Sequence, residues 1–204
     1  MTVADYVAQT IVNLRVQHVF TVSGAGMLYL LDSIRKNPEL EYVCNHHEQA
    51  CAMAAESYAR FREGIGVALV TFGPGVTNAI TGVMGAWMDS VPLLVISGQG
   101  KLADTIGHSR LRQRGIQEIN TIPLVQSFTK YAALVQSEKD IEHELRTALK
   151  AAFEGRSGPA WLDIPMDIQN TLCPDDIAPI FLDEVIDQGK LNPQESVYET
   201  ILER

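Results

Sequence analysis

Apolar residues follow two spacings along this chain, and the two spacings alternate. Segments in which they recur every three or four residues predict helices, whereas short continuous apolar runs predict strands buried on both faces. The expected strands are 18–22, 41–44, 65–71, 92–97, 130–135 and 159–164, and the expected helices are 3–17, 27–36, 48–62, 76–89, 123–128 and 141–152. This order predicts an α/β fold, a three-layer sandwich with a mostly parallel six-stranded sheet and helices on both faces.

The alternation ends near residue 170, and we expect residues 1–170 to form one domain. Residues 171–204 are predicted to be a linker and the start of a further helix, which Asn192 caps and Pro193 opens. Nothing earlier in the chain is an obvious partner for the apolar face of that helix. We therefore expect a fragment of a longer polypeptide, with a missing middle domain after Arg204.

Two of the expected helices are rich in small residues. Alanines recur through 48–62, and Gly82 and Gly85 interrupt 76–89, where each lowers helix stability by about 1 kcal/mol relative to alanine. Close packing against another helix, or against a second subunit, would compensate for this loss.

Composition excludes several classes of protein. The chain is 46% hydrophobic and 20% charged, which is ordinary for a globular domain. A net charge of −9 argues against nucleic acid or an anionic membrane as a partner. No apolar run could span a bilayer, and the start lacks a signal sequence, so a cytoplasmic location is expected.

Two residue groups have no clear chemistry. The basic cluster 110–114 is expected to be a solvated loop or a subunit contact. Cys44, Cys51 and Cys173 lack metal or redox spacing, so we expect reduced thiols that behave as small buried hydrophobes.

Glu48 is the first candidate for chemistry, because it follows the strand 41–44 directly and opens a helix. It is either a functional carboxyl at the end of a buried strand or an acid that stabilises the helix dipole. A metal site made with His46 and His47 is disfavoured, since adjacent residues of an extended segment point in opposite directions. No metal ligands are predicted in this chain.

A second candidate is the loop Gly73-Pro74-Gly75, between a buried strand and a helix. Such a loop can hold an anion, or it can be a structural turn. Asn78 occupies the position where a dinucleotide fingerprint would need glycine, and no Gly-Lys-Ser or Gly-Lys-Thr is present for a P-loop.

Read together, these segments resemble the acetolactate synthase group of thiamine-diphosphate-dependent enzymes, in their amino-terminal, pyrimidine-binding domain. The resemblance covers about residues 1–170. It is carried in order by 45–60, 73–78, 88–93, 98–99, 115–120 and 158–165.

The resemblance implies roles for individual residues. Glu48 would bond the ring nitrogen of the aminopyrimidine and promote its imino form, Gly73, Pro74, Gly75 and Asn78 would line the pyrimidine pocket, Gly24 would face the thiazolium, and Gln117 would lie near the substrate. Burial between subunits would favour the protonated form of such a carboxyl, whereas a helix amino terminus favours the ionised form.

The chain also departs from the family pattern. Ile116 and Asn120 stand where acetolactate synthases commonly carry phenylalanine and an acid, and Ser23-Gly24-Ala25-Gly26 differs from the usual proline-glycine-glycine turn. The Gly-Asp-Gly motif that binds magnesium and the diphosphate is absent from the sequence. The resemblance therefore implies that Mg²⁺ binds on a missing domain, as would FAD where the family has it.

The resulting hypothesis is that this chain is one domain of an enzyme that acts on a small 2-keto acid such as pyruvate. We expect it to form a homodimer and to be inactive without the missing domains. The alternatives are a noncatalytic binding or assembly module that keeps the fold, and a nucleotide-binding α/β protein.

Overall fold

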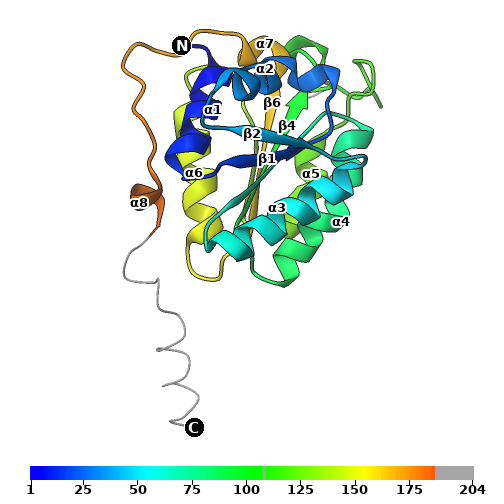
Figure 1. Cartoon of the computed structure of the whole chain (residues 1–204). Coiled ribbons are helices and arrows are strands. Elements are labelled where there is room, and N and C mark those ends of the chain that lie inside the picture. The colour runs from blue at the N-terminus through cyan, green and yellow to red at the C-terminus, as the bar shows by residue number, and fades with distance from the viewer. Residues whose placement is uncertain (108, 187–204) are drawn as a thin grey trace.

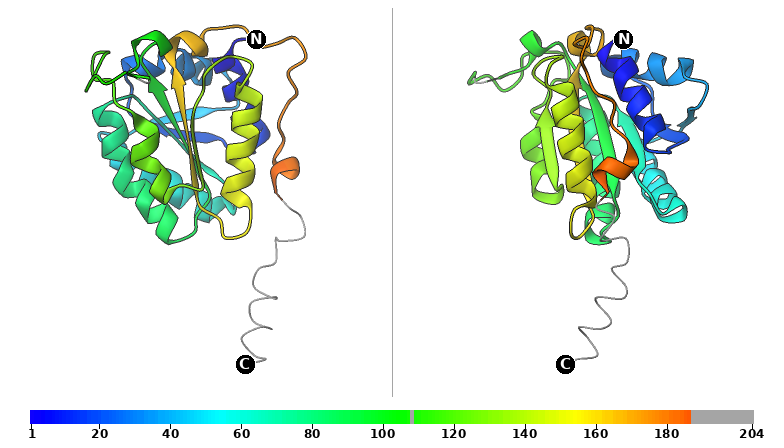
Figure 2. Two further views of the ribbon diagram at one scale, coloured as in Figure 1. Left: turned by 180° about the vertical axis from the view of Figure 1, so that it is seen from behind. Right: turned by 90° about the vertical axis from the view of Figure 1, so that its left-hand side faces the viewer.

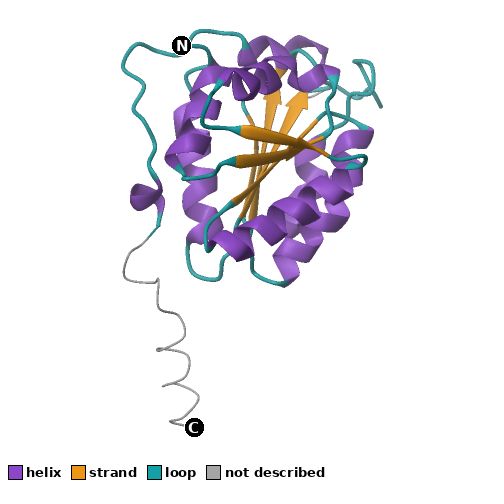
Figure 3. Ribbon diagram, in the orientation of Figure 1, coloured by secondary structure: helices purple, strands orange, loops and turns teal. Residues whose placement is uncertain are grey.

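The computed structural model describes residues 1–107 and 109–186. The helix expected from residue 192 lies outside them. Six strands form one sheet in the order β2-β1-β3-β4-β6-β5, and every pair is parallel (Figures 1 and 3). The strands are β1 His18–Thr21, β2 Glu41–Cys44, β3 Gly66–Val70, β4 Leu93–Gln99, β5 Tyr131–Leu134 and β6 Pro159–Pro165. The predicted α/β fold is confirmed.

Helices cover both faces of the sheet, which makes three layers (Figure 2). One face packs against α1 Val3–Asn13, α2 Leu28–Lys36 and α6 Ile141–Phe153, and the other against α3 Glu48–Arg62, α4 Pro74–Met88 and α5 Thr121–Val125. Short helical turns are η1 Ala25–Met27, η2 Leu102–Asp104, η3 Gln126–Phe128, α7 Met166–Gln169 and α8 Leu182–Val185. β3, β4 and β6 are buried along their whole length, as their continuous apolar sequences predict.

Several predicted boundaries were wrong. α1 starts at Val3 as predicted, after the N-cap Thr2, which forms a capping box with Asp5, but it ends at Asn13 instead of residue 17. Arg15 adopts a left-handed conformation with φ of 62°, which ends the helix. β4 continues to Gln99, two residues further than predicted, because it pairs with β6 along that whole length.

The strand before Glu48 was expected to be buried, and this was wrong. β2 lies at the edge of the sheet and pairs only with β1, so three of its four residues are exposed. Cys44 is therefore exposed, contrary to prediction, while Cys51 and Cys173 are buried as expected.

The close packing predicted from small residues occurs between α3 and α4. A Cβ added to Gly82 would lie 2.6 Å from Cβ of Ala52, so the two helices touch at these positions. A Cβ on Gly85 would meet nothing within 4 Å. Gly82 thus explains part of the small-residue pattern, and Gly85 faces open space.

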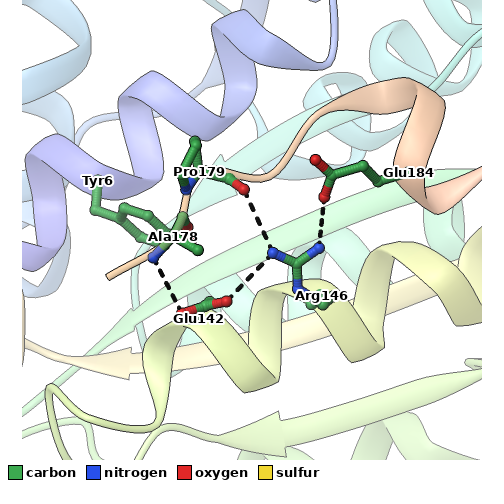
Figure 4. Close-up of polar contacts among 6 residues, drawn as sticks. All are labelled: Tyr6, Glu142, Arg146, Ala178, Pro179 and Glu184. Carbon is green, nitrogen blue, oxygen red and sulfur yellow. Dashed lines mark hydrogen bonds and ion pairs between the residues drawn. The ribbon is translucent and has the colours of Figure 1, made fainter. Parts of the chain in front are cut away.

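Residues 171–186, predicted to belong to a linker, run as a strap across α1 and α6 (Figure 4). The strap buries Ile180 completely. Tyr6 of α1 donates a hydrogen bond to the carbonyl of Ala178 at 2.7 Å, and Arg146 of α6 pairs with Glu184 at 2.7 Å. This segment therefore contributes to the core on that face of the sheet.

Candidate functional site

The candidate residues gather where the strand order reverses. β1 is followed in the chain by β2 on one side, and β3 then pairs with β1 on the other side. In open parallel sheets the crevice beyond the carboxyl ends of the strands at such a point is the usual ligand site. Gly24 follows β1, Glu48 follows β2 and Gly73 follows β3, so this edge carries all three.

Glu48 is the first residue of α3 and is only 8% exposed. Its Oε2 accepts a hydrogen bond from Nδ2 of Asn78, in α4, at 2.9 Å. The other oxygen, Oε1, lies beside Gly75, where an added Cβ would be 3.3 Å away. No other hydrogen bond to this carboxyl comes from residues 1–107 or 109–186.

The preceding residue explains how the carboxyl is aimed inward. His47 is the N-cap of α3, and its Nδ1 accepts a hydrogen bond from the backbone N–H of Gln49 at 3.1 Å. The exposed imidazole of His47 therefore caps the amino terminus of α3. The carboxyl of Glu48 is not needed as the cap and can turn toward α4. This favours the functional interpretation of Glu48 over the helix-dipole interpretation.

The turn after β1 rests against the end of β3 through Thr71. A Cβ on Gly24 would lie 2.4 Å from Cβ of Thr71, and Thr71 Oγ1 accepts a hydrogen bond from the N–H of Gly26 at 3.2 Å. A Cβ on Gly75 would lie 2.9 Å from Cγ2 of the same threonine. Sequence reasoning missed Thr71, although its place as the residue after an apolar strand was a usable signal.

Gln117 contacts the site through its backbone carbonyl, which lies against Gly73. Gly73 has a φ of +66°, and a Cβ there would lie 2.5 Å from the carbonyl oxygen of Gln117. Only glycine combines this conformation with so close an approach. Gln117 itself has a φ of +56°. Loop 115–120 therefore lies directly on loop 73–75, and Pro74 is exposed at the first turn of α4.

The structure thus brings together the residues predicted for the cofactor pocket. Two buried polar residues at the same sheet edge, Gln99 and Asp163, were missed as functional candidates. Both lie in segments that carry the family resemblance, 98–99 and 158–165, but neither was predicted to have a role of its own. A polar residue inside an apolar strand was the signal for Asp163.

Within residues 1–107 and 109–186, no group of three or more histidine, cysteine, aspartate or glutamate side chains could hold a metal ion. His46 and His47 are exposed while Glu48 is buried. The described helices include none that is long and apolar enough to cross a bilayer.

The amino-acid sequence has relatives among known proteins. Residues 1–124 match the family described as thiamine pyrophosphate enzyme, N-terminal TPP binding domain. Among curated proteins, the acetolactate synthase large subunit of Buchnera aphidicola (subsp. Schizaphis graminum) is 38% identical over 165 residues, which are 81% of this chain and 28% of that protein. The acetolactate synthase isozyme 3 large subunit of Escherichia coli K12 is 34% identical over 190 residues, 93% of this chain and 32% of the relative.

A eukaryotic relative, the mitochondrial acetolactate synthase of Schizosaccharomyces pombe, is 33% identical over 186 residues, which are 87% of this chain and 27% of that enzyme. The chain thus spans about a third of the length of these relatives or less. The predicted family is confirmed: the chain belongs to the thiamine pyrophosphate enzymes and carries their N-terminal TPP binding domain.

Proposed function

We propose that this chain is the pyrimidine-binding half of a thiamine-diphosphate-dependent enzyme of the acetolactate synthase type. The reaction would decarboxylate a 2-keto acid such as pyruvate and transfer the activated aldehyde to an acceptor. The observation that carries the proposal is the buried Glu48 carboxyl, held by Asn78 at a sheet edge bordered by glycines.

These residues fit an aminopyrimidine ring. Asn78 donates a hydrogen bond to Oε2 of Glu48, so Oε1 remains available to bond a ring nitrogen of the cofactor. Gly73 and Gly75 have no side chains, so the backbone of 73–75 can form a flat surface against the aminopyrimidine ring. Pro74, between them, is exposed. Bound thiamine diphosphate would supply the electron sink that decarboxylation requires.

Within this pocket the chain's own groups have distinct tasks. Glu48 would hold a proton at the ring nitrogen, and Asn78 would keep the carboxyl from rotating. Gln117, on the loop against Gly73, would lie on the substrate side and contact the 2-keto acid.

The second part of the proposal is a homodimer through α3 and α4. Their outer face is exposed and uncharged over three turns, and it begins next to Glu48. It consists of Ala50, Met53, Ser57, Thr77, Thr81, Met84 and Met88. An uncharged patch that includes three exposed methionines suits burial against a second copy.

The remaining requirements would be met outside this chain. Mg²⁺ and the diphosphate would bind on another domain, and FAD, if used, would too. The chain alone is then inactive. The alternative proposal is a noncatalytic assembly module. It predicts no turnover of pyruvate even when the other domains are supplied.

The test is a chain completed with the remaining domains of the E. coli relative. Glu48→Gln keeps the size of the side chain and its contact with Asn78 but cannot take up a proton, so pyruvate turnover should fall by about 10²-fold or more. Glu63→Gln, at the exposed end of α3, is the matched control and should retain turnover.

Equal activity of the two variants would overturn the role of Glu48. A completed wild type that neither turns over pyruvate nor binds thiamine diphosphate would support the assembly module instead. Thermal stabilisation by a nucleotide, but not by a thiamine analogue, would support the nucleotide-binding alternative.

A further inference from the structure

We propose that Gln99 is a positioning residue, which ties the loop carrying Gln117 to the sheet while Asp163 holds the Gln99 amide in the orientation that this requires. The proposal concerns residues outside the cofactor pocket. Its catalytic consequence, though not the tie itself, rests on the proposed function of Gln117.

Gln99 is the last residue of β4 and is 2% exposed. Its Nε2 donates two hydrogen bonds, one to Asp163 Oδ2 at 2.9 Å and one to the carbonyl oxygen of Ile119 at 3.1 Å. Its Oε1 accepts from the N–H of Gly100 at 2.9 Å. Every hydrogen of the amide is thus used, and one of them bridges a buried strand to the loop.

Asp163 sets the direction of that amide. It lies on β6 with 1% exposure, and its Oδ1 accepts a hydrogen bond from Ser97 Oγ at 2.6 Å. Ser97 Oγ in turn accepts from Nε1 of Trp161 at 2.8 Å. Because Oδ2 can only accept from Gln99 when Nε2 faces it, the amide cannot flip without losing this bond.

The charge state of Asp163 does not break the arrangement. Burial raises the pKa of Asp163 to about 6, and the charge of Glu118 also raises it, whereas hydrogen bonds from Ser97 and Gln99 oppose the shift. A protonated carboxyl can donate from Oδ1 to Ser97 while Oδ2 still accepts from Gln99. The tie therefore depends on the acceptor and not on the charge.

The loop that precedes Ile119 has its own hydrogen bonds. Both carboxylate oxygens of Glu118 accept backbone hydrogen bonds, Oε1 from Ile106 at 3.2 Å and Oε2 from Arg114 at 3.3 Å. These bonds close the loop on itself. The bond from Gln99 to Ile119 joins the closed loop to the sheet, two residues away from Gln117.

The tie reaches the cofactor pocket through the contact already described between Gly73 and the Gln117 carbonyl. If Ile119 moves, loop 115–120 moves over loop 73–75. Within residues 1–107 and 109–186, the side-chain hydrogen bonds of Gln99 go to Ile119, Asp163 and Gly100 and not to Glu48 or the pocket glycines. Its effect on substrate is therefore expected to pass through the loop.

The structural test uses backbone order parameters from amide relaxation of the 204-residue chain. Gln99→Met keeps the volume and removes the amide, so order parameters of 117–120 should fall below about 0.6 while those of 94–97 stay unchanged. Gln126→Met, at an exposed position of η3, is the control and should change neither. An unchanged loop in Gln99→Met would overturn the proposal, as would equal loosening of the strand.

Asp163 supplies a rescue test. In Asp163→Asn the amide oxygen can accept from Gln99 while the NH₂ donates to Ser97 Oγ, so loop order should persist. Asp163→Leu removes the acceptor and should loosen the loop as Gln99→Met does. Loosening in Asp163→Asn, with the fold intact, would contradict the claim that the acceptor is what matters.

The catalytic test uses the completed enzyme. Gln99→Met should raise KM for the 2-keto acid about tenfold and leave the Kd for thiamine diphosphate unchanged. The double variant Gln99→Met/Gln117→Ala should be no worse than Gln117→Ala, since both act through one side chain. Full additivity would exclude action through Gln117. A loosened loop without any change in KM would keep the tie and reject the substrate role of Gln117.

Discussion

Glu48 is the first residue of α3 and Asn78 lies in the second turn of α4, and a single 2.9 Å hydrogen bond joins Nδ2 of Asn78 to Oε2 of Glu48. The bond therefore couples α3, which follows the edge strand β2, to α4, which follows the central strand β3. It also fixes one oxygen of the carboxyl and leaves the other beside Gly75.

Asn78→Ala should destabilise the fold by about 1–2 kcal/mol, because it removes the donor to a nearly buried carboxyl. Denaturant unfolding measures the change. Thr81→Ala, one turn later on the exposed face of α4, should have less than half this effect. Equal effects would mean that the bond contributes nothing to stability.

Gly82→Ala and Gly85→Ala should change stability in opposite directions. At 82 the new methyl group meets Ala52 at 2.6 Å and should destabilise by about 1–3 kcal/mol. At 85 it meets nothing, and the gain in helix propensity should stabilise by up to about 1 kcal/mol. Thermal unfolding of both variants checks the pair, and a stabilised Gly82→Ala would contradict the close contact of α3 with α4.

Asp163 should make stability depend on pH between about 4 and 6. Burial raises its pKa from 3.8 to about 6, so in this range the folded state binds more protons than the unfolded state. The contribution of Asp163 is then fully present below the lower value and is lost as pH rises through the higher one.

The measurement is the stability of wild type relative to Asp163→Asn across pH. The difference should shift in favour of the asparagine variant by roughly 2 kcal/mol between pH 4 and pH 7. Asp176→Asn, in the exposed part of the strap, is the control for general effects of a lost acid. A flat difference for Asp163→Asn would show that burial does not favour its protonated form.

Ile180→Ala tests whether the strap is part of the folded core. Ile180 is fully buried, and truncation should reduce the free energy of unfolding by about 2–4 kcal/mol. The neighbouring Phe181 is 46% exposed, and Phe181→Ala should cost much less. If both substitutions were neutral, the strap would be detached from the domain in solution.

Met84→Glu should prevent self-association through α3 and α4. Met84 is 37% exposed on the uncharged outer face, and a buried unpaired carboxylate would be strongly unfavourable in a dimer. Sedimentation of wild type and variant reports the change, with Phe61→Glu at the 87% exposed end of α3 as the control. A wild type that remains monomeric at high concentration would argue against this interface.

Local sequence patterns were sufficient to predict the α/β fold class and the candidate residues at the carboxyl ends of the strands. The short apolar runs that became β3, β4 and β6 predicted strands covered on both faces, because an exposed sheet face would break such a run with polar residues. Glu48 and Gly73-Pro74-Gly75 were found because each stands at a strand-to-helix crossover, which is visible within a few residues.

The tertiary structure alone decided which of these segments meet. Nothing local to residues 41–44 indicates that β2 pairs with a single neighbour, and that pairing is why Cys44 is exposed. Asn78 meets Glu48 across 30 residues, and Gln99 meets Asp163 across 64. Periodicity reports the conformation of a segment and its buried face, whereas these contacts depend on strand order and register, which arise from packing between distant segments.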